Sequence, residues 1–123
     1  MGKKGFRDLI VWQRSKDLAV LIYQITSSGP ISKDYSLRDQ IRRSVVSIPS
    51  NIAEGDERDT DRDSIRFFFI AKGSLAELRT QIEIAFNIGY LSKADYQKLE
   101  QECEELAKML GRLIQTRQKK LCP

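Results

Sequence analysis

The stretch QIRRSVVSIPSNIAEG, residues 40–55, carries the pattern that decides the fold. Its apolar residues recur at steps of three or four, which is the spacing of one face of a helix. With Leu37 just before the stretch, they are Ile41, Val45, Ile48 and Ile52. At about 100° per residue, a small and polar stripe lies beside this face. A stripe of amides and hydroxyls favours close approach by another backbone, and we predict that its members make subunit contacts: Gln40, Ser44, Ser47, Asn51 and Glu54.

Pro49 lies inside this helical pattern. A proline there removes the hydrogen bond to the carbonyl of Val45 and costs about 3 kcal/mol. Because the apolar phase continues unbroken from Ile41 to Ile52, we expect one helix over residues 36–55, kinked at Pro49. Near its end, Glu54 opposes the helix dipole. An arginine from the third helix or from a neighbouring subunit would compensate for this, and a solvated glutamate that simply bears the cost is the alternative.

Three further segments carry helical periodicity, at about residues 7–27, 61–88 and 93–118. The connections between the four segments are short, so consecutive helices are expected to be antiparallel neighbours. The predicted fold class is all-α, an antiparallel up-down-up-down four-helix bundle. We expect a single domain over residues 1–123, whose basic tail at 119–123 is frayed.

Composition agrees with a soluble helical protein. The 123 residues are 41% apolar and 31% charged, and they include three prolines and seven glycines. The longest apolar runs are far shorter than a membrane span, and the basic amino terminus lacks an apolar signal region. We therefore expect a cytoplasmic protein without membrane contact.

The absence of histidine from the sequence restricts the possible chemistry. Histidine is the commonest general base and the commonest metal ligand, so catalytic triads and zinc sites that use it are excluded. Cys103 and Cys122 lack metal-ligand spacing, and the acidic run at 56–63 lacks the glycine and the terminal glutamate of a calcium loop. We predict no catalytic residue, no metal site and no cofactor, and hence a protein that is not an enzyme.

The basic residues suggest a different role. They number 21 against 17 acidic residues, which gives a formal net charge of +4 and favours a polyanionic partner. Long cationic side chains on rigid helices suit contacts to phosphates, although a solvated charged surface is the alternative. Exposed aromatic side chains for stacking on bases are not evident. The candidate nucleic-acid contacts are Arg38, Arg42, Arg43, Arg117, Lys119 and Lys120.

Three pieces of the sequence together resemble a known family. They are Phe6-x-x-Leu9 followed by Trp12, the stretch QIRRSVVSIPSNIAEG, and FFFIAKGSLAELRTQIEIAFNIGYLS at residues 67–92. The chain is similar to the four-helix-bundle family that includes proteins encoded in intervening sequences of bacterial 23S ribosomal RNA genes. A more distant resemblance is to the accessory variability protein of diversity-generating retroelements. These resemblances imply a homopentameric ring without enzymatic activity, whose partner is structured RNA or an RNA-handling protein.

Two functional hypotheses follow. The first is a non-enzymatic, homo-oligomeric scaffold that associates with structured RNA, or another nucleic acid, through backbone and shape contacts. The alternative is a protein–protein interaction module that binds no nucleic acid directly, in which case the basic residues serve solubility or contact acidic patches on a partner.

Overall fold

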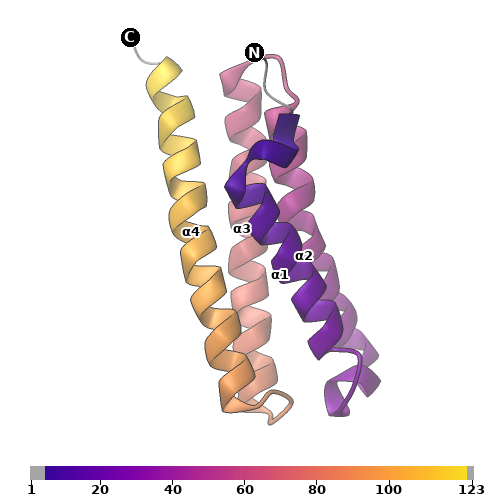
Figure 1. The fold of residues 1–123 in the computed structure, drawn as a ribbon. Coiled ribbons are helices and arrows are strands. Elements are labelled where there is room, and N and C mark those ends of the chain that lie inside the picture. Colours follow the sequence, from indigo (N-terminus) through magenta and orange to yellow (C-terminus); the bar gives the residue numbers. More distant parts are fainter. Residues whose placement is uncertain (1–4, 122–123) are drawn as a thin grey trace.

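The computed structural model describes residues 5–121, in which four α-helices form an antiparallel bundle (Figure 1). The helices are α1 (Ile10–Ile25), α2 (Tyr35–Asp56), α3 (Asp61–Asn87) and α4 (Lys93–Leu121), and short 3-10 helices at Gly5–Asp8 and Pro30–Lys33 precede α1 and α2. Each helix packs against the next along the chain, and α1 also packs against α4, which closes the bundle. The predicted all-α, up-down-up-down four-helix bundle is confirmed.

The largest differences from the expected helix bounds are at the two ends of the chain. At the amino-terminal end, α1 begins only at Ile10, because a 3-10 turn occupies Gly5–Asp8. At the carboxyl end, α4 continues through Leu121, so Lys119 and Lys120 are helical, and fraying of this tail stays a prediction. The rest of that predicted tail, residues 122–123, and the first four residues of the predicted domain lie outside the described residues.

The helix α2 runs through Pro49 without interruption. The apolar face that the sequence predicted is almost fully buried, with exposed fractions of 0–2% for Ile41, Val45, Ile48 and Ile52. Burial of these side chains offsets the backbone hydrogen bond that the proline removes. The prediction of one continuous helix is confirmed, and the bend at Pro49 stays a prediction.

Gly55 marks a close contact between α2 and α3. A Cβ atom at this position would lie 2.5 Å from Cε1 of Phe68 and 3.0 Å from the carbonyl oxygen of Ser64. The hydroxyl of Ser64 donates a hydrogen bond to the carbonyl of Gly55 at 2.6 Å. Glycine is therefore required here because α3 leaves no room for a side chain.

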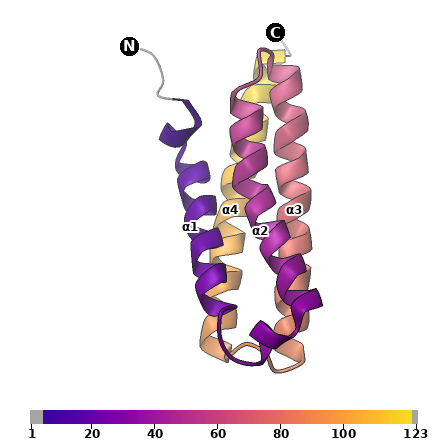
Figure 2. The same ribbon diagram turned by 90° about the vertical axis from the view of Figure 1, so that its right-hand side faces the viewer.

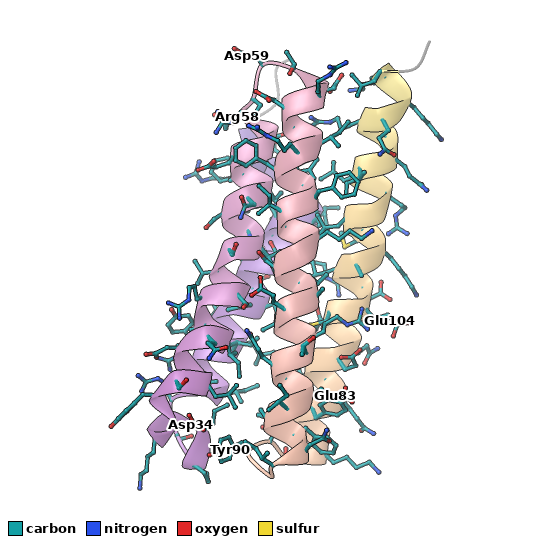
Figure 3. All side chains as sticks on the ribbon, turned by 180° about the vertical axis from the view of Figure 1, so that it is seen from behind. Asp34, Arg58, Asp59, Glu83, Tyr90 and Glu104 are labelled. Carbon is teal, nitrogen blue, oxygen red and sulfur yellow. The ribbon has the colours of Figure 1, made fainter. Side chains whose placement is uncertain are left out.

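At each end of the bundle, polar contacts join elements that are distant in the sequence. At one end, the hydroxyl of Tyr90, in the α3–α4 connection, donates to Oδ2 of Asp34 at 3.0 Å (Figure 3). Asp34 also caps α2, because its Oδ1 accepts from the backbone N–H of Leu37 at 3.2 Å. At the other end, Arg117 of α4 donates to Asp56, the last residue of α2.

None of the helices within residues 5–121 has both the length and the apolar character needed to cross a membrane.

Candidate nucleic-acid interface and subunit contacts

The basic residues predicted to contact nucleic acid do not form one patch. Arg38 lies in the first half of α2, whereas Lys119 and Lys120 lie in the last turn of α4. In Figure 1, α2 begins at the lower end of the bundle and α4 ends at the upper end. With a rise of about 1.5 Å per residue, Arg38 is about 27 Å along α2 from Asp56, which contacts Arg117 just before the two lysines. The two groups therefore cannot contact the same short segment of a ligand.

Arg117 is a structural residue, which corrects its prediction as a phosphate contact. Its side chain is 10% exposed and lies 3.1 Å from Oδ1 of Asp56, whose side chain is 3% exposed. Its second terminal nitrogen lies 3.7 Å from Asp61, and its guanidinium carbon is 5.3 Å from the ring centre of Phe68. Burial and two carboxylates leave this guanidinium inaccessible to a phosphate, so we remove Arg117 from the candidates.

Arg42 is held in place where α1 and α2 meet. Its Nε donates to Oγ1 of Thr26 at 2.9 Å, and its Nη2 lies 3.4 Å from the carbonyl oxygen of Tyr23 and from Oγ of Ser27. The guanidinium carbon lies 4.4 Å from the ring centre of Tyr23, within the range of a cation–π interaction. These contacts fix the guanidinium against α1.

Arg38 makes a similar set of contacts one turn earlier in α2. Its Nη1 donates to the carbonyl of Ser32 at 3.0 Å, and its Nε donates to Oδ1 of Asp39 at 3.0 Å. The guanidinium carbon lies 4.8 Å from the ring centre of Tyr35. Within residues 5–121, Nη2 of Arg38 and Nη1 of Arg42 make no hydrogen bond that a ligand would have to displace.

Two exposed tyrosines accompany these arginines, contrary to the expectation that exposed aromatic side chains are not evident. Tyr35 is 65% exposed and Tyr23 is 42% exposed. We call Tyr23, Tyr35, Arg38 and Arg42 the tyrosine–arginine cluster. An exposed aromatic ring beside a guanidinium offers a stacking surface for a base and an N–H donor for a phosphate.

Sequence reasoning missed both tyrosines, for different reasons. Tyr35 and Arg38 are three residues apart on α2, a spacing that brings two side chains together on a helix surface, so a local signal was present. Tyr23 and Arg42 come from different helices, and no local pattern connects them.

Arg43 and the two tail lysines are exposed, as nucleic-acid contacts would have to be. Arg43 lies away from the tyrosine–arginine cluster and lines a polar pocket of about 210 Å³ between α2 and α3, together with Ser44, Ser47, Ser74 and Glu77. The tail lysines end α4, where positive charge is favourable beside the helix dipole.

Within the predicted polar stripe of α2, Ser47 contacts α3 of the same chain, and Asn51 bonds back to Ser47. Oγ of Ser47 lies 2.8 Å from Oγ of Ser74, and Asn51 donates to the carbonyl and to Oγ of Ser47 at 2.8 and 3.0 Å. Ser44 is buried. A close approach of the kind predicted from small residues is therefore present within the chain at Ser47 and Ser74, and the predicted subunit contacts of Ser44, Ser47 and Asn51 stay a prediction.

The other two members of the stripe are exposed. Gln40 donates to Oγ of Ser36 at 3.4 Å. Glu54 accepts from Nη2 of Arg58 at 3.2 Å. Within the chain, the arginine beside Glu54 thus comes from the α2–α3 connection and not from the third helix, and the predicted contact of Glu54 with a neighbouring subunit stays a prediction.

Possible metal ligands are not gathered into a site anywhere in residues 5–121. No cluster of three or more acidic, cysteine or histidine side chains in that part of the chain has the arrangement of a metal site. Cys103 is buried, and burial, followed by the negative charge of Glu100, raises the pKa of its thiol to about 12. A thiol that stays protonated is a poor nucleophile.

Comparison with known proteins identifies a family and a similar solved structure for this bundle. The sequence model described as "23S rRNA-intervening sequence protein" matches residues 7–112. The chain belongs to this family. A similar solved structure is a crystal structure of a protein with unknown function from the S23 ribosomal protein family of Bacteroides thetaiotaomicron. It has 26% sequence identity and a TM-score of 0.78, over 85% of this chain and 98% of the other. No curated protein matches.

Proposed function

We propose that this protein is a non-enzymatic, homo-oligomeric scaffold in the cytoplasm that binds structured RNA through its tyrosine–arginine cluster. The cluster is the observation that supports the proposal: Tyr35 and Tyr23 are exposed, and each lies beside a guanidinium. The family description, which refers to an intervening sequence of 23S rRNA, points to the same class of ligand. The resemblance described above suggests a pentamer as the assembled form.

The chemistry of the cluster favours unpaired nucleotides presented by a folded RNA. Sequence-specific proteins reach loops and bulges of RNA by stacking splayed bases on aromatic rings or guanidinium planes. Here a base would stack on the exposed Tyr35, and Arg38 and Arg42 would donate to the flanking phosphates. Their guanidinium groups are already oriented by Ser32 and Thr26, so binding orders few additional side chains.

Oligomerisation would bring several copies of the tyrosine–arginine cluster to one RNA and so increase the affinity for it. One cluster offers two stacking rings and two guanidinium groups, but copies repeated around a symmetric assembly contact several points on one RNA. Linked sites bind far more tightly than each site alone. The net positive charge of each copy adds to the field that attracts a polyanion.

The test measures retention of a stem-loop RNA on wild-type protein and on a Tyr35→Ala/Arg38→Gln variant, at increasing salt concentration. Loss of one stacked base costs about 1–3 kcal/mol, so we expect at least a fivefold weaker affinity per site. Removal of one phosphate contact should also reduce the slope of log affinity against log salt by roughly 0.7–0.9. Arg62→Gln, an exposed arginine at the other end of the bundle, is the matched control.

Wild-type protein that retains no RNA at low salt would refute the proposal. So would a cluster variant whose affinity and salt dependence equal those of Arg62→Gln. If capture experiments instead give one stoichiometric protein, insensitive to nuclease, the alternative of a protein-interaction module is favoured.

A further inference from the structure

The polar pocket between α2 and α3 shares no residue with the tyrosine–arginine cluster. Its volume is about 210 Å³, and the two helices that form it lie side by side in Figure 2 and pack against each other. The hydrogen bond between Ser47 and Ser74 closes one end of the pocket, and Gln40 and Gln81 line the other end. Because seven residues separate the two ends on each antiparallel helix, the pocket is about 10 Å long.

Ser44 brings a buried hydroxyl without a partner to this pocket. The residue is 7% exposed and lines the pocket. Within residues 5–121 its hydroxyl makes no hydrogen bond, not even to the carbonyl one turn earlier in the helix, which serine often uses. The neighbouring hydroxyls of Ser47 and Ser74, by contrast, bond to each other. A buried hydroxyl that lacks a partner is costly, and a molecule bound in the pocket would supply one.

Two opposite charges lie at the rim of the pocket without pairing. Arg43 comes from α2 and Glu77 from α3, and both side chains are exposed. Neither side chain makes an ion pair or a hydrogen bond within the described part of the chain. Elsewhere in the bundle, charges on neighbouring helices pair directly, as Arg79 does with Glu100. A cation and an anion held apart on opposite walls leave room for a ligand that carries both charges.

We infer that this pocket binds a free α-amino acid with an uncharged side chain, a function that does not depend on the proposed binding of RNA. The guanidinium of Arg43 would donate to the carboxylate of the ligand, and the ammonium group of the ligand would donate to the carboxylate of Glu77. The hydroxyl of Ser44 would donate to the ligand's carboxylate from the floor of the pocket. A phosphate or a simple cation fits less well, because one of the two rim charges would repel it.

A shallow hollow beside the pocket accommodates the side chain of the ligand. Its volume is about 420 Å³, and it shares Gln40, Glu77 and Gln81 with the pocket. Its other walls are mostly small or apolar and include Ala76 and Ile84. Among the described residues that line the hollow, Glu77 alone is charged, so an apolar side chain fits and an acidic one would be repelled. Leucine has such a side chain and is therefore the probe.

The experiment measures the affinity of wild-type protein for three related ligands by isothermal titration calorimetry. L-Leucine carries both charges, leucinamide lacks the carboxylate, and N-acetyl-leucine lacks the ammonium group. We expect leucine to bind at least about 10-fold more tightly than either of the other two, because each of them loses one hydrogen bond between charged groups.

Variants of the pocket assign each charge of the ligand to one residue. Arg43→Gln should weaken leucine binding about 10-fold and leave leucinamide binding unchanged, because leucinamide has no carboxylate for the arginine to hold. Glu77→Gln should weaken leucine binding and leave N-acetyl-leucine binding unchanged. Ser44→Ala should weaken leucine binding about fivefold, with unchanged helical circular dichroism. Arg112→Gln, at an exposed arginine of α4, is the matched control and should bind leucine as wild-type protein does.

Three results would overturn the inference. The first is wild-type protein that binds leucine with a Kd weaker than about 10 mM. The second is equal affinity for leucine, leucinamide and N-acetyl-leucine, since the two rim charges would then hold nothing. The third is leucine binding to Arg43→Gln and Glu77→Gln that is as tight as binding to Arg112→Gln. If leucine does not bind and Arg43→Gln retains less RNA than wild-type protein, Arg43 contacts phosphate and the inference is wrong.

Discussion

Replacing Gly55 by alanine tests the contact between α2 and α3 directly. The new Cβ would lie 2.5 Å from Cε1 of Phe68, whereas ordinary contacts begin at 3.4 Å. The ring would therefore have to move by about 0.9 Å to restore normal packing. Phe68 is fully buried, and the guanidinium of Arg117 lies against its face, so the ring cannot move without disturbing its neighbours.

Two effects of opposite sign determine how much Gly55→Ala changes the free energy of unfolding. Overpacking a buried site costs about 1–3 kcal/mol, whereas replacing a helical glycine by alanine returns up to about 1 kcal/mol. We expect a net loss of about 1–2 kcal/mol, or a Tm lower by roughly 3–8 °C. Gly111→Ala in α4 is the matched control, because a Cβ there meets nothing within 4 Å. The control should raise stability by about 0.5–1 kcal/mol.

The assay is urea denaturation at one fixed protein concentration, because assembly contributes to apparent stability. A third variant, Gly55→Ala combined with Phe68→Leu, supplies the coupling energy. If the ring causes the loss, adding Gly55→Ala to Phe68→Leu should cost less than adding it to wild-type protein. Equal stabilisation by Gly55→Ala and Gly111→Ala would refute the reasoning, since it would mean that Phe68 yields without cost.

Further predictions concern three other features: the Ser47–Ser74 hydrogen bond, Arg117 and Cys103. Ser47→Ala and Ser74→Ala should each cost about 1 kcal/mol, and the double variant little more than either, because no unpaired hydroxyl then remains; urea denaturation measures this. Arg117→Met should cost about 3 kcal/mol, because it removes a buried guanidinium that contacts both Asp56 and Asp61, and RNA retention should be unchanged. In a Cys122→Ser protein, the folded thiol of Cys103, with its pKa raised to about 12 from 9.0, should resist a thiol reagent at pH 8 until urea unfolds the chain. Because the folded state holds this proton more strongly than the unfolded state, thermal stability should fall as pH rises from 9 towards 12, and a Cys103→Ala protein should lack this part of the fall.

The fold could be predicted from the sequence better than the candidate sites could, because the contacts in the sites join residues that are far apart along the chain. Arg117 follows Leu110 and Ile114 on a strongly amphipathic helix, but the sequence gives no sign that its guanidinium meets Asp56, which is distant along the chain. The same holds for Tyr23 and Arg42, which come from different helices. Each of these pairs forms only when helices pack, so a reading based on one helix at a time assigns Arg117 to the surface and overlooks Tyr23.

The sequence by itself determined the helices, their approximate ends and the apolar face of each, because helical periodicity and breaking residues act over a few neighbouring positions. Continuity of α2 through Pro49 followed from the phase of Ile41, Ile48 and Ile52, which are buried as expected. Only the tertiary structure decided which polar residues are used in contacts between helices and which remain on the surface. Packing of α3 against α2 takes up Ser47 and leaves no space at Gly55, and packing of α4 buries Arg117.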